Sequence, residues 1–353
     1  MLLKIRKIFC IISMILKATP HRDWAADDMQ RRQAGFVRYC LKCINFQGEF
    51  TMKKMYFIYN PVAGKAAINK NLGKIIDAFT KADYQVTAYP TQKDGDAVGA
   101  AKYACQGDFE VIVCAGGDGT LSQVLCGVMD SENKLPIGYI PAGSTNDFAD
   151  TLGIPKGIMN AVRWIIGGKP VRCDVGGFND KYFSYIAAFG AFTNITYETS
   201  QRLKNVFGHA AYLANGAASL PKLHSVRMRV EYDDKIIEDD FIYGMVTNTA
   251  SVAGLLSLKG FKLSDGLFEV TLVKKPKNPL HMERLFRTLL HIDGELSDEY
   301  IRYFRTDKIK FTALEKTPVS WTCDGEYGGN SKVNIISNNC RAVSFIRGKR
   351  KKS

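Results

Sequence analysis

Residues 55–140 alternate between two patterns of apolar positions. Short runs of buried-strand type, rich in β-branched and aromatic residues, lie at 55–59, 84–89, 111–115 and 136–140. Between them, segments near 68–79, 96–105 and 121–129 carry apolar residues at helical spacing, so that each can present one face to a core. Strands that alternate with helices in this way predict a doubly wound parallel sheet, which binds ligands beyond the carboxyl ends of its strands.

The pattern changes after residue 175. Short strands now follow one another with few helices between them. The expected strands are Tyr182–Phe189, Val226–Tyr232, Phe241–Asn248, Leu267–Val273, Lys308–Ala313, Val319–Cys323 and Val333–Ile336. Such a succession predicts a second domain built as an antiparallel sandwich or barrel.

A glycine turn follows three of the predicted parallel strands. The turns are Asn60-Pro61-Val62-Ala63-Gly64-Lys65, Gly116-Gly117-Asp118-Gly119-Thr120 and Gly143-Ser144-Thr145-Asn146-Asp147. Glycine lets the backbone bend with positive φ and brings bare N–H groups close to a ligand, and the helix that follows adds partial positive charge. Because parallel strands end at the same edge, we expect the three turns to face one phosphate-binding crevice.

Two charged residues in these turns indicate what accompanies the phosphate. The carboxylate of Asp118 would repel phosphate unless a cation lay between them, which suggests Mg²⁺ held together with nucleotide oxygens. Lys65 either reaches a phosphate or is an ordinary solvated lysine. Its loop lacks the second glycine-lysine-serine/threonine arrangement of a full Walker motif.

Asp324-Gly325-Glu326 comes directly after the predicted strand at 319–323. Two acids flanking a glycine can supply a general base and a carboxylate on the metal side, and phosphoryl transfer to an alcohol needs both. The same three residues also suit a polar hairpin turn. Taken alone, this segment favours the turn.

Together, these motifs resemble those of a known family. They are N-P-V-A-G at 60–64, G-G-D-G-T at 116–120, P-A-G-S-T-N-D-F-A at 141–149, L-S-D-G at 263–266 and D-G-E at 324–326. In order and spacing they are similar to the bacterial soluble diacylglycerol kinases and related lipid kinases, over residues 53 to 347. The G-G-D-G-T motif is shared with NAD kinases and, loosely, phosphofructokinases, whereas T-N-D-F-A and the final D-G-E favour the lipid branch.

The resemblance implies an ATP-dependent lipid kinase with two domains. An N-terminal Rossmann-like nucleotide domain would comprise 53–173 together with about 338–347, and a β-sandwich-like lipid-binding domain would comprise 174–337. The enzyme would move the γ-phosphoryl group of ATP to a lipid hydroxyl, with diacylglycerol as the favoured acceptor and phosphatidate as the product. Sphingoid, ceramide, monoacylglycerol, phosphatidylglycerol and undecaprenyl-like acceptors stay open.

The same resemblance assigns site residues. The nucleotide site would be lined by Asn60, Pro61, Gly64, Lys65, Thr91, Gly116, Gly117, Asp118, Gly119, Thr120, Thr145 and Asn146. Asp118 and Asp147 would organise a catalytic Mg²⁺, and Glu326 or Asp324 would take the proton from the lipid hydroxyl. Asp265 resembles the family's acidic ligand for a second, structural Mg²⁺, although the residues around it replace a commoner acidic pair.

Composition and net charge limit the classes of molecule that this protein is expected to bind. A chain with 46% hydrophobic and 24% charged residues is typical of globular proteins, and a formal net charge of +13 favours anionic partners. Nucleic acid is disfavoured, because no zinc-finger spacing, RNA-binding aromatic motif or dominant basic block is present. We expect a cytoplasmic protein that visits the anionic inner face of the membrane as a peripheral enzyme, and a homodimer would fit the family.

The two ends of the chain differ from the rest. A basic start followed by the apolar stretch Ile8–Leu16 resembles a secretion signal, but it has no evident cleavage site and is too short to span a bilayer. We expect the leader, residues 1–52, to be disordered, or translation to begin near Met52. The basic tail at 348–353 either attracts anionic lipid, at roughly 1 kcal/mol per basic residue, or serves as a solubilising end.

Two other functions stay open on the sequence alone. A kinase of the NAD kinase type would phosphorylate a polar acceptor without any dependence on lipid vesicles. A non-catalytic sensor of lipid or nucleotide would use the same fold without chemistry. The acids retained at 118, 147, 324 and 326 argue against a sensor.

Overall fold

A parallel sheet forms the first part of the chain in the computed structural model, which describes residues 52–144, 146–190, 224–249, 251–252, 256–257, 262–275 and 297–349. Its strands are β1 (Lys53–Tyr59), β2 (Tyr84–Pro90), β3 (Val111–Gly116) and β4 (Ile137–Pro141), in the spatial order β2-β1-β3-β4. Its helices are α3 (Ala63–Thr80), α4 (Asp96–Gln106), α5 (Asp118–Met129), α6 (Asp147–Leu152) and α7 (Ile158–Ile166).

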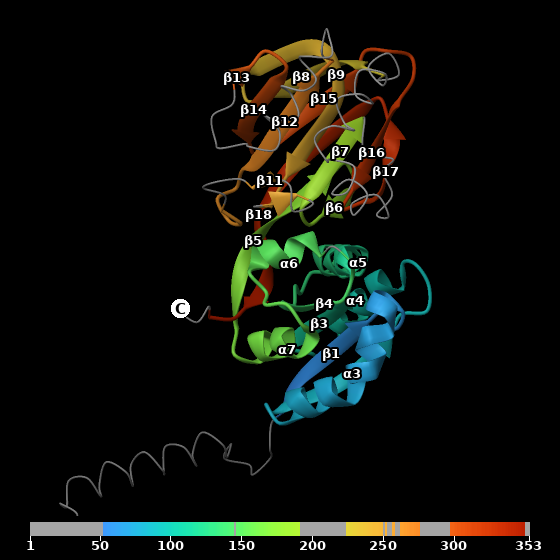
Figure 1. Ribbon diagram of the computed structural model, residues 1–353, viewed down its shortest axis with the longest axis vertical. Helices are drawn as coiled ribbons and strands as arrows, with labels where there is room; N and C mark the ends of the chain where they lie inside the picture. Colours follow the sequence, from blue (N-terminus) through green and yellow to red (C-terminus); the bar gives the residue numbers. More distant parts are fainter. Residues whose placement is uncertain are drawn as a thin grey trace, which may run out of the picture. The chain divides into compact units, whose positions relative to one another are not determined.

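The helices cover both faces of this sheet. Helix α4 packs against α5, and α3 packs against α7 (Figure 1). Strand β3 is therefore buried along its whole length, which explains its unbroken apolar sequence. The predicted doubly wound parallel sheet is confirmed. None of the helices in the described ranges is long and apolar enough to cross a bilayer.

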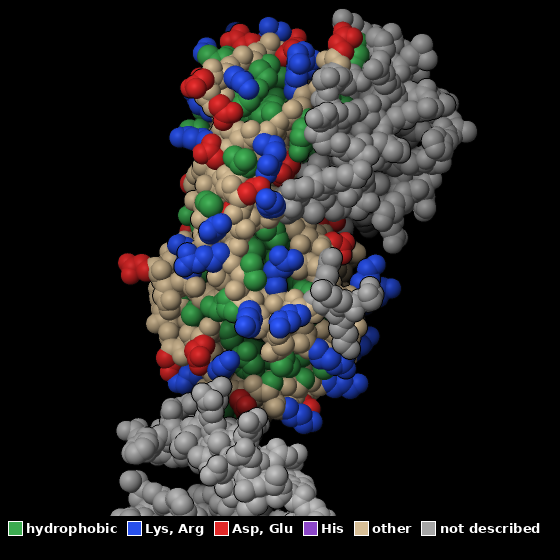
Figure 2. All heavy atoms as spheres, turned by 90° about the vertical axis from the view of Figure 1, so that its left-hand side faces the viewer, with side chains coloured by type: hydrophobic (Ala, Val, Ile, Leu, Met, Phe, Trp, Pro, Cys, Tyr) green, Lys and Arg blue, Asp and Glu red, His purple; other side chains and the backbone are tan. Residues whose placement is uncertain are grey.

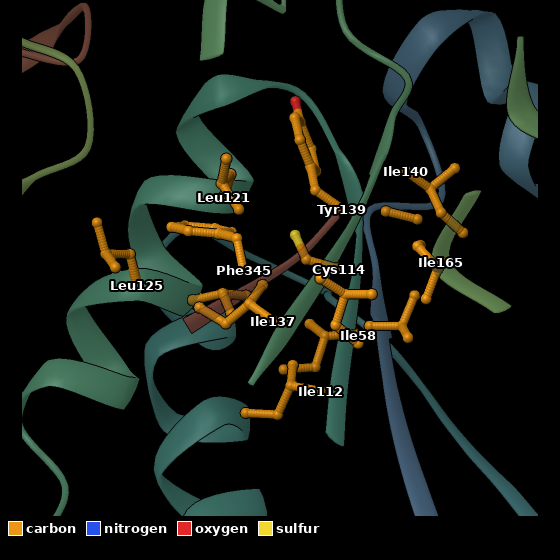
Figure 3. Packing of buried hydrophobic residues seen from close by; sticks show 14 of the residues in the cluster. Ile58, Ile112, Cys114, Leu121, Leu125, Ile137, Tyr139, Ile140, Ile165 and Phe345 are labelled. Atoms are coloured by element: carbon orange, nitrogen blue, oxygen red, sulfur yellow. The ribbon is translucent and has the colours of Figure 1, made fainter. Parts of the chain in front are cut away.

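The end of the chain returns to this first part. Strand β18 (Val333–Arg347) runs parallel to β4, where Phe345 lies opposite Ile137, and antiparallel to β5 (Lys169–Phe178). Phe345 is buried and packs edge-on against Phe148, with ring centroids 5.1 Å apart. Figure 3 shows it among side chains of α5 and β4. The last strand is thus part of the first core.

We expect Phe345→Leu to lower the free energy of unfolding by about 1–2 kcal/mol, because it removes an aromatic pair and leaves a small void. Urea denaturation of the whole chain measures this cost. The matched control is Ile335→Leu on the same strand, where the side chain is 41% exposed and the expected change is within about 0.5 kcal/mol. Equal urea midpoints for the two variants would show that Phe345 does not stabilise the packing of the last strand on the first part of the chain.

The remaining strands extend the sheet. Within the described residues one continuous sheet of 16 strands runs β13-β14-β12-β9-β8-β15-β18 and then into the parallel strands, with a branch through β7, β16 and β17. The main strands of this part are β7 (Ile186–Gly190), β8 (Val226–Tyr232), β9 (Lys235–Thr247), β12 (Phe268–Lys274), β14 (Ile301–Thr306), β15 (Lys308–Ala313), β16 (Val319–Cys323) and β17 (Glu326–Ser331). The short strands are β6 (Lys181–Phe183), β10 (Ser251–Val252), β11 (Leu256–Ser257) and β13 (Ser297–Asp298).

Strand β9 is long enough to pair with different strands along its two halves. Its first part pairs with β8, and its second part pairs with β7 and β12. On strand β16, Trp321 is fully buried and packs against Phe178, Phe189 and Phe311, at ring-centroid distances of 5.2, 4.8 and 5.0 Å. The β-rich part therefore has its own aromatic core, in agreement with the predicted sandwich-like domain.

Two of the predicted strands differ from the structure because of contacts with distant residues. The expected strand 182–189 is split into β6 and β7, because the backbone N–H groups of Ser184 and Tyr185 donate to the side chain of Asp324 instead of to a neighbouring strand. The expected strand 333–336 continues to Arg347, where it joins the first core. Neither difference has a local signal, because both depend on partners far away in the sequence.

Candidate active site

The strand order of the parallel sheet places its topological switch point between β1 and β3. The chain leaves β1 toward β2 on one side and later returns to β3 on the other side, so the connections diverge at this point. Ligands of doubly wound sheets bind at such a switch point, beyond the carboxyl ends of the strands. The turn at 60–65 follows β1 and the turn at 116–120 follows β3. These two predicted phosphate turns thus flank the switch point.

The three glycine turns contact one another. The Ala142 N–H donates to the Gly116 carbonyl at 2.8 Å. A β-carbon on Gly64 would lie 2.3 Å from the Ala142 carbonyl oxygen, and one on Gly117 would lie 3.4 Å from the Gly143 Cα. The turns are therefore packed backbone against backbone, which only glycine allows at Gly64. The expectation that they share one edge is met.

The first turn has a strained backbone. Asn60 Oδ1 accepts a hydrogen bond from the Val62 N–H at 3.0 Å, and Gly64, Lys65 and Ala66 have φ values of 57, 56 and 59°. The left-handed conformation costs a residue other than glycine roughly 1–2 kcal/mol. Strain of this kind persists where surrounding structure imposes it, often at ligand sites. The side chain of Lys65 is exposed beside this turn, where it can reach a bound anion.

We expect Lys65→Ala to raise the KM for ATP several-fold and to leave kcat within about twofold, because one exposed cation adds modest binding energy. Steady-state kinetics with varied ATP measure the split. The control is Lys70→Ala, which removes an exposed lysine farther along α3 and should change neither constant. Complete loss of turnover in Lys65→Ala would mean that this lysine takes part in the transfer itself.

Asp118 is a buried acid at the start of α5. Burial, together with the nearby charges of Asp147 and Asp324, raises its pKa to about 7, although the backbone N–H groups of Phe148 and Asp147 act in the opposite direction. No donor from the described part of the chain reaches Asp118 Oδ1, although this oxygen is buried. A buried carboxylate oxygen without a partner is costly unless a cation or another donor completes it.

The carboxylates at this place fit a magnesium ion shared with a nucleotide. Asp147, at the first position of α6, is also buried and interacts electrostatically with Asp118. Among the described residues no three acid, histidine or cysteine side chains gather closely enough to hold a metal alone. Mg²⁺ usually takes one or two carboxylates and completes its shell with phosphate oxygens and water. The donor set suits that mode of binding.

The other predicted nucleotide residues have different surroundings. The Thr91 N–H donates to the Tyr59 carbonyl at 2.9 Å, so Thr91 lies at the carboxyl end of β1. Thr120 packs over Gly116, where a β-carbon would come within 2.5 Å of its hydroxyl. The amide of Asn146 both donates to and accepts from the Gly143 backbone at 2.8 Å, so it shapes the turn. Thr145 lies outside the described residues.

The side chain of Glu326 lies beside the second glycine turn, at 116–120. Asp324 and Gly325, with φ values of 51 and 86°, form the two-residue turn between β16 and β17, and Glu326 is the first residue of β17. A β-carbon on Gly119 would lie 3.1 Å from Glu326 Oε1. The exposed carboxylate of Glu326 therefore lies directly against the turn that also carries Asp118.

Asp324 has a different environment from Glu326. Its carboxylate is buried, with Oδ2 accepting from the Ser184 N–H at 2.6 Å and hydroxyl at 2.9 Å. Oδ1 accepts from the N–H groups of Tyr185 and Ile186 at 3.0 and 3.2 Å. Burial raises the pKa of Asp324 and these donors oppose the rise. The sequence pointed to both acids equally, and it missed Ser184, whose only signal is a hydroxyl inside an apolar run.

Asp265 lies in the β-rich part. Its carboxylate forms an ion pair with Arg305 and also accepts from the Leu267 N–H at 3.3 Å. Arg305 in turn pairs with Glu269 at 3.2 Å. A structural Mg²⁺ at Asp265 would compete with Arg305 for the carboxylate, and no chemical step is assigned to it. The expected metal role of Asp265 stays a prediction.

The site combines glycine turns at the edge of a nucleotide-binding type of sheet with two buried carboxylates and an exposed glutamate beside them. This combination defines a phosphotransferase. Residues 54–178 match the family model of the diacylglycerol kinase catalytic domain. The chain is 36% identical over 281 residues to a diacylglycerol kinase of Bacillus subtilis, covering 79% of this chain and 91% of the relative. It is 35% identical over 286 residues to one of Staphylococcus carnosus, covering 81% and 92%. The chain belongs to the diacylglycerol kinase family.

Solved structures agree on the fold. A crystal structure of a putative diacylglycerol kinase from Bacillus anthracis superposes with a TM-score of 0.70 at 21% identity, over 85% of this chain and 99% of the other. A diacylglycerol kinase structure from the same organism gives a TM-score of 0.67. These structures share the N-terminal Rossmann-like part and the β-rich part that follows it.

Proposed function

We propose that this protein transfers the γ-phosphoryl group of ATP to the free hydroxyl of diacylglycerol, giving phosphatidate and ADP. The observation that carries the proposal is the contact between Glu326 and the turn at 116–120, where Gly119 leaves room for the carboxylate. A base at the phosphate turn is the arrangement that transfer to an alcohol requires. The identity of the chain to named diacylglycerol kinases supports this acceptor.

The residues have separate tasks in the proposed reaction. The backbone N–H groups of the glycine turns bind the ATP phosphates. Asp118 and Asp147 hold Mg²⁺, which when bound neutralises charge on the phosphates. Glu326 accepts the proton of the lipid hydroxyl while that oxygen bonds to the γ-phosphorus and the bond to the bridging oxygen of ADP breaks. Asp324 has its oxygens occupied by backbone and serine donors, so we assign the base to Glu326 alone.

We propose that residues 53–173 with about 338–347 bind ATP and that residues 174–337 bind the lipid. Two separate groups of buried apolar residues support the division, one in the α/β part and one in the β-rich part. A few residues beyond 173 still contribute to the first core, among them Val175 and Tyr185. The leader, the tail beyond Lys349 and residue 145 lie outside the described residues, so the expectations for them stay predictions.

We also propose that the protein acts at the anionic inner surface of the cytoplasmic membrane. Lysine and arginine side chains predominate over acidic ones on the α/β part of the face drawn in Figure 2. Together with the net charge of +13, this favours attraction to acidic head groups, at roughly 1 kcal/mol per basic residue near the surface. The homodimer stays a prediction from the family resemblance.

Of the two other functions, the NAD kinase type is not favoured, because the curated relatives are diacylglycerol kinases. A non-catalytic sensor has no need for the buried acids at 118 and 147 with Glu326 beside them, all of which this chain retains.

The test is transfer of label from γ-labelled ATP, with Mg²⁺, into diacylglycerol dispersed in anionic vesicles, with NAD as a parallel acceptor. We expect labelled phosphatidate and unlabelled NAD. Label in NAD alone would move the protein to the soluble-substrate kinases, and label in neither acceptor would support a sensor. A total lipid extract in place of diacylglycerol identifies another acceptor by chromatography.

A further inference from the structure

We infer that Ser184 is a positioning residue for phosphoryl transfer, because its hydroxyl anchors Asp324 and thereby places Glu326 against the turn at 116–120. The inference rests on the proposed role of Glu326 as the base. It concerns the corner between β6 and β7, residues 181–186, which belongs to neither the glycine turns nor the D-G-E segment.

The corner holds the turn between β16 and β17 through one carboxylate. Asp324 is 1% exposed and receives four hydrogen bonds from residues 184–186. Because the turn contains only Asp324 and Gly325, the position of the Asp324 side chain decides where Glu326 begins β17. A second link follows two residues later, where Lys181 Nζ donates to the Gly328 carbonyl at 3.2 Å.

The same corner is attached to the helix that carries the metal-side acid. Strand β6 packs on α5, and the Cys126 thiol of α5 donates to the Tyr182 carbonyl at 3.7 Å. Helix α5 begins at Asp118. The corner therefore contacts both the element that starts with Asp118 and the element that starts with Glu326. It thus links the elements that carry these two acids.

Ser184 is the part of this anchor that a mutation can remove. Of the four hydrogen bonds that residues 184–186 donate to Asp324, three come from backbone N–H groups that any residue supplies, and the fourth comes from the Ser184 hydroxyl. Ser184 is itself 1% exposed, so water cannot readily replace its hydroxyl. Loss of one donor to a buried carboxylate weakens the anchor. A displacement of about 1 Å at reacting groups costs up to about 10²-fold in rate.

The experiment compares three variants of the full chain in the vesicle assay. We expect Ser184→Ala to lower kcat about tenfold with an unchanged KM for ATP, and Ser184→Thr, which keeps a hydroxyl, to recover most of the loss. The control is Ser331→Ala at the far end of β17, whose hydroxyl donates to the Val333 carbonyl at 2.9 Å. A wild-type kcat in Ser184→Ala, or a threonine variant as slow as the alanine variant, overturns the inference.

Amide hydrogen exchange of residues 319–331 separates this inference from the proposed function. We expect faster exchange in Ser184→Ala and no change in Ser331→Ala. Faster exchange with unchanged turnover would support the anchor but overturn its role in positioning the groups for transfer, whereas the identity of the base is tested by variants of Glu326. Unchanged exchange overturns the anchor whichever acceptor the enzyme uses, because this measurement needs no substrate.

Discussion

Asp118→Ala is expected to lower kcat for phosphoryl transfer by about 10³-fold or more while the chain stays folded. The buried Oδ1 of Asp118 has no partner from the described residues, and this oxygen is the one we assign to Mg²⁺. Removing a carboxylate that holds the ion removes charge stabilisation worth several kcal/mol in the transition state. Turnover in the vesicle assay measures the loss. Wild-type turnover in this variant would remove the central claim about the site.

The control for this prediction lies on the same helix. Asp130 follows α5 at its other end and forms an exposed ion pair with Lys102 at 2.8 Å. Asp130→Ala should leave turnover unchanged, because exposed pairs contribute little. Added Mg²⁺ with ATP should raise the melting temperature of the wild type and of Asp130→Ala, but not of Asp118→Ala.

The same acid should show an opposite effect on stability. Its pKa of about 7 lies above the ordinary value of 3.8, so the folded chain binds this proton more tightly than the unfolded chain does. The resulting stabilisation is present below pH 3.8 and is lost as pH rises through about 7. Without divalent metal, Asp118→Asn should therefore have a higher melting temperature than the wild type at pH 8. The free energy of unfolding should rise by at most about 4 kcal/mol, and this gain should shrink toward pH 4. Equal melting temperatures at pH 8 would contradict the burial of this charge.

Glu326→Gln should reduce kcat by about 10²–10⁴-fold, the usual contribution of a general base, and should leave the KM for ATP nearly unchanged. The amide keeps the size of the side chain beside Gly119 but does not accept the proton. Single-turnover transfer in vesicles measures the rate of the chemical step. Glu132→Gln, at an exposed site in the loop before β4, is the matched control. If Glu326→Gln retained the wild-type rate, the base would have to be another group.

Local patterns were sufficient for much of the α/β part. The apolar run at 111–115 became β3, and the glycine turns lie at the ends of β1, β3 and β4, as their spacing predicted. Such patterns are informative because strand and helix periods, and the conformational freedom of glycine, act over a few residues. The order and chemistry of these turns also led to the correct family.

The roles of Asp324 and Glu326 could not be separated in this way. Both are acids beside one glycine, and only the fold shows that one is buried against residues 184–186 while the other faces Gly119. The partners of Asp324 are about 140 residues away in the chain, as the separation of 140 between Ser184 and Asp324 shows. No local rule connects residues at such a distance.

The sequence by itself thus determined the parallel sheet, the phosphate turns and the class of chemistry, because each depends on short-range periodicity and on side-chain type. The tertiary structure alone decided which residues of the last strand pair with β4, that Arg305 pairs with Asp265, and that Ser184 holds the turn before Glu326. These features depend on hydrogen bonds and packing between distant segments, which exist only after the chain has folded.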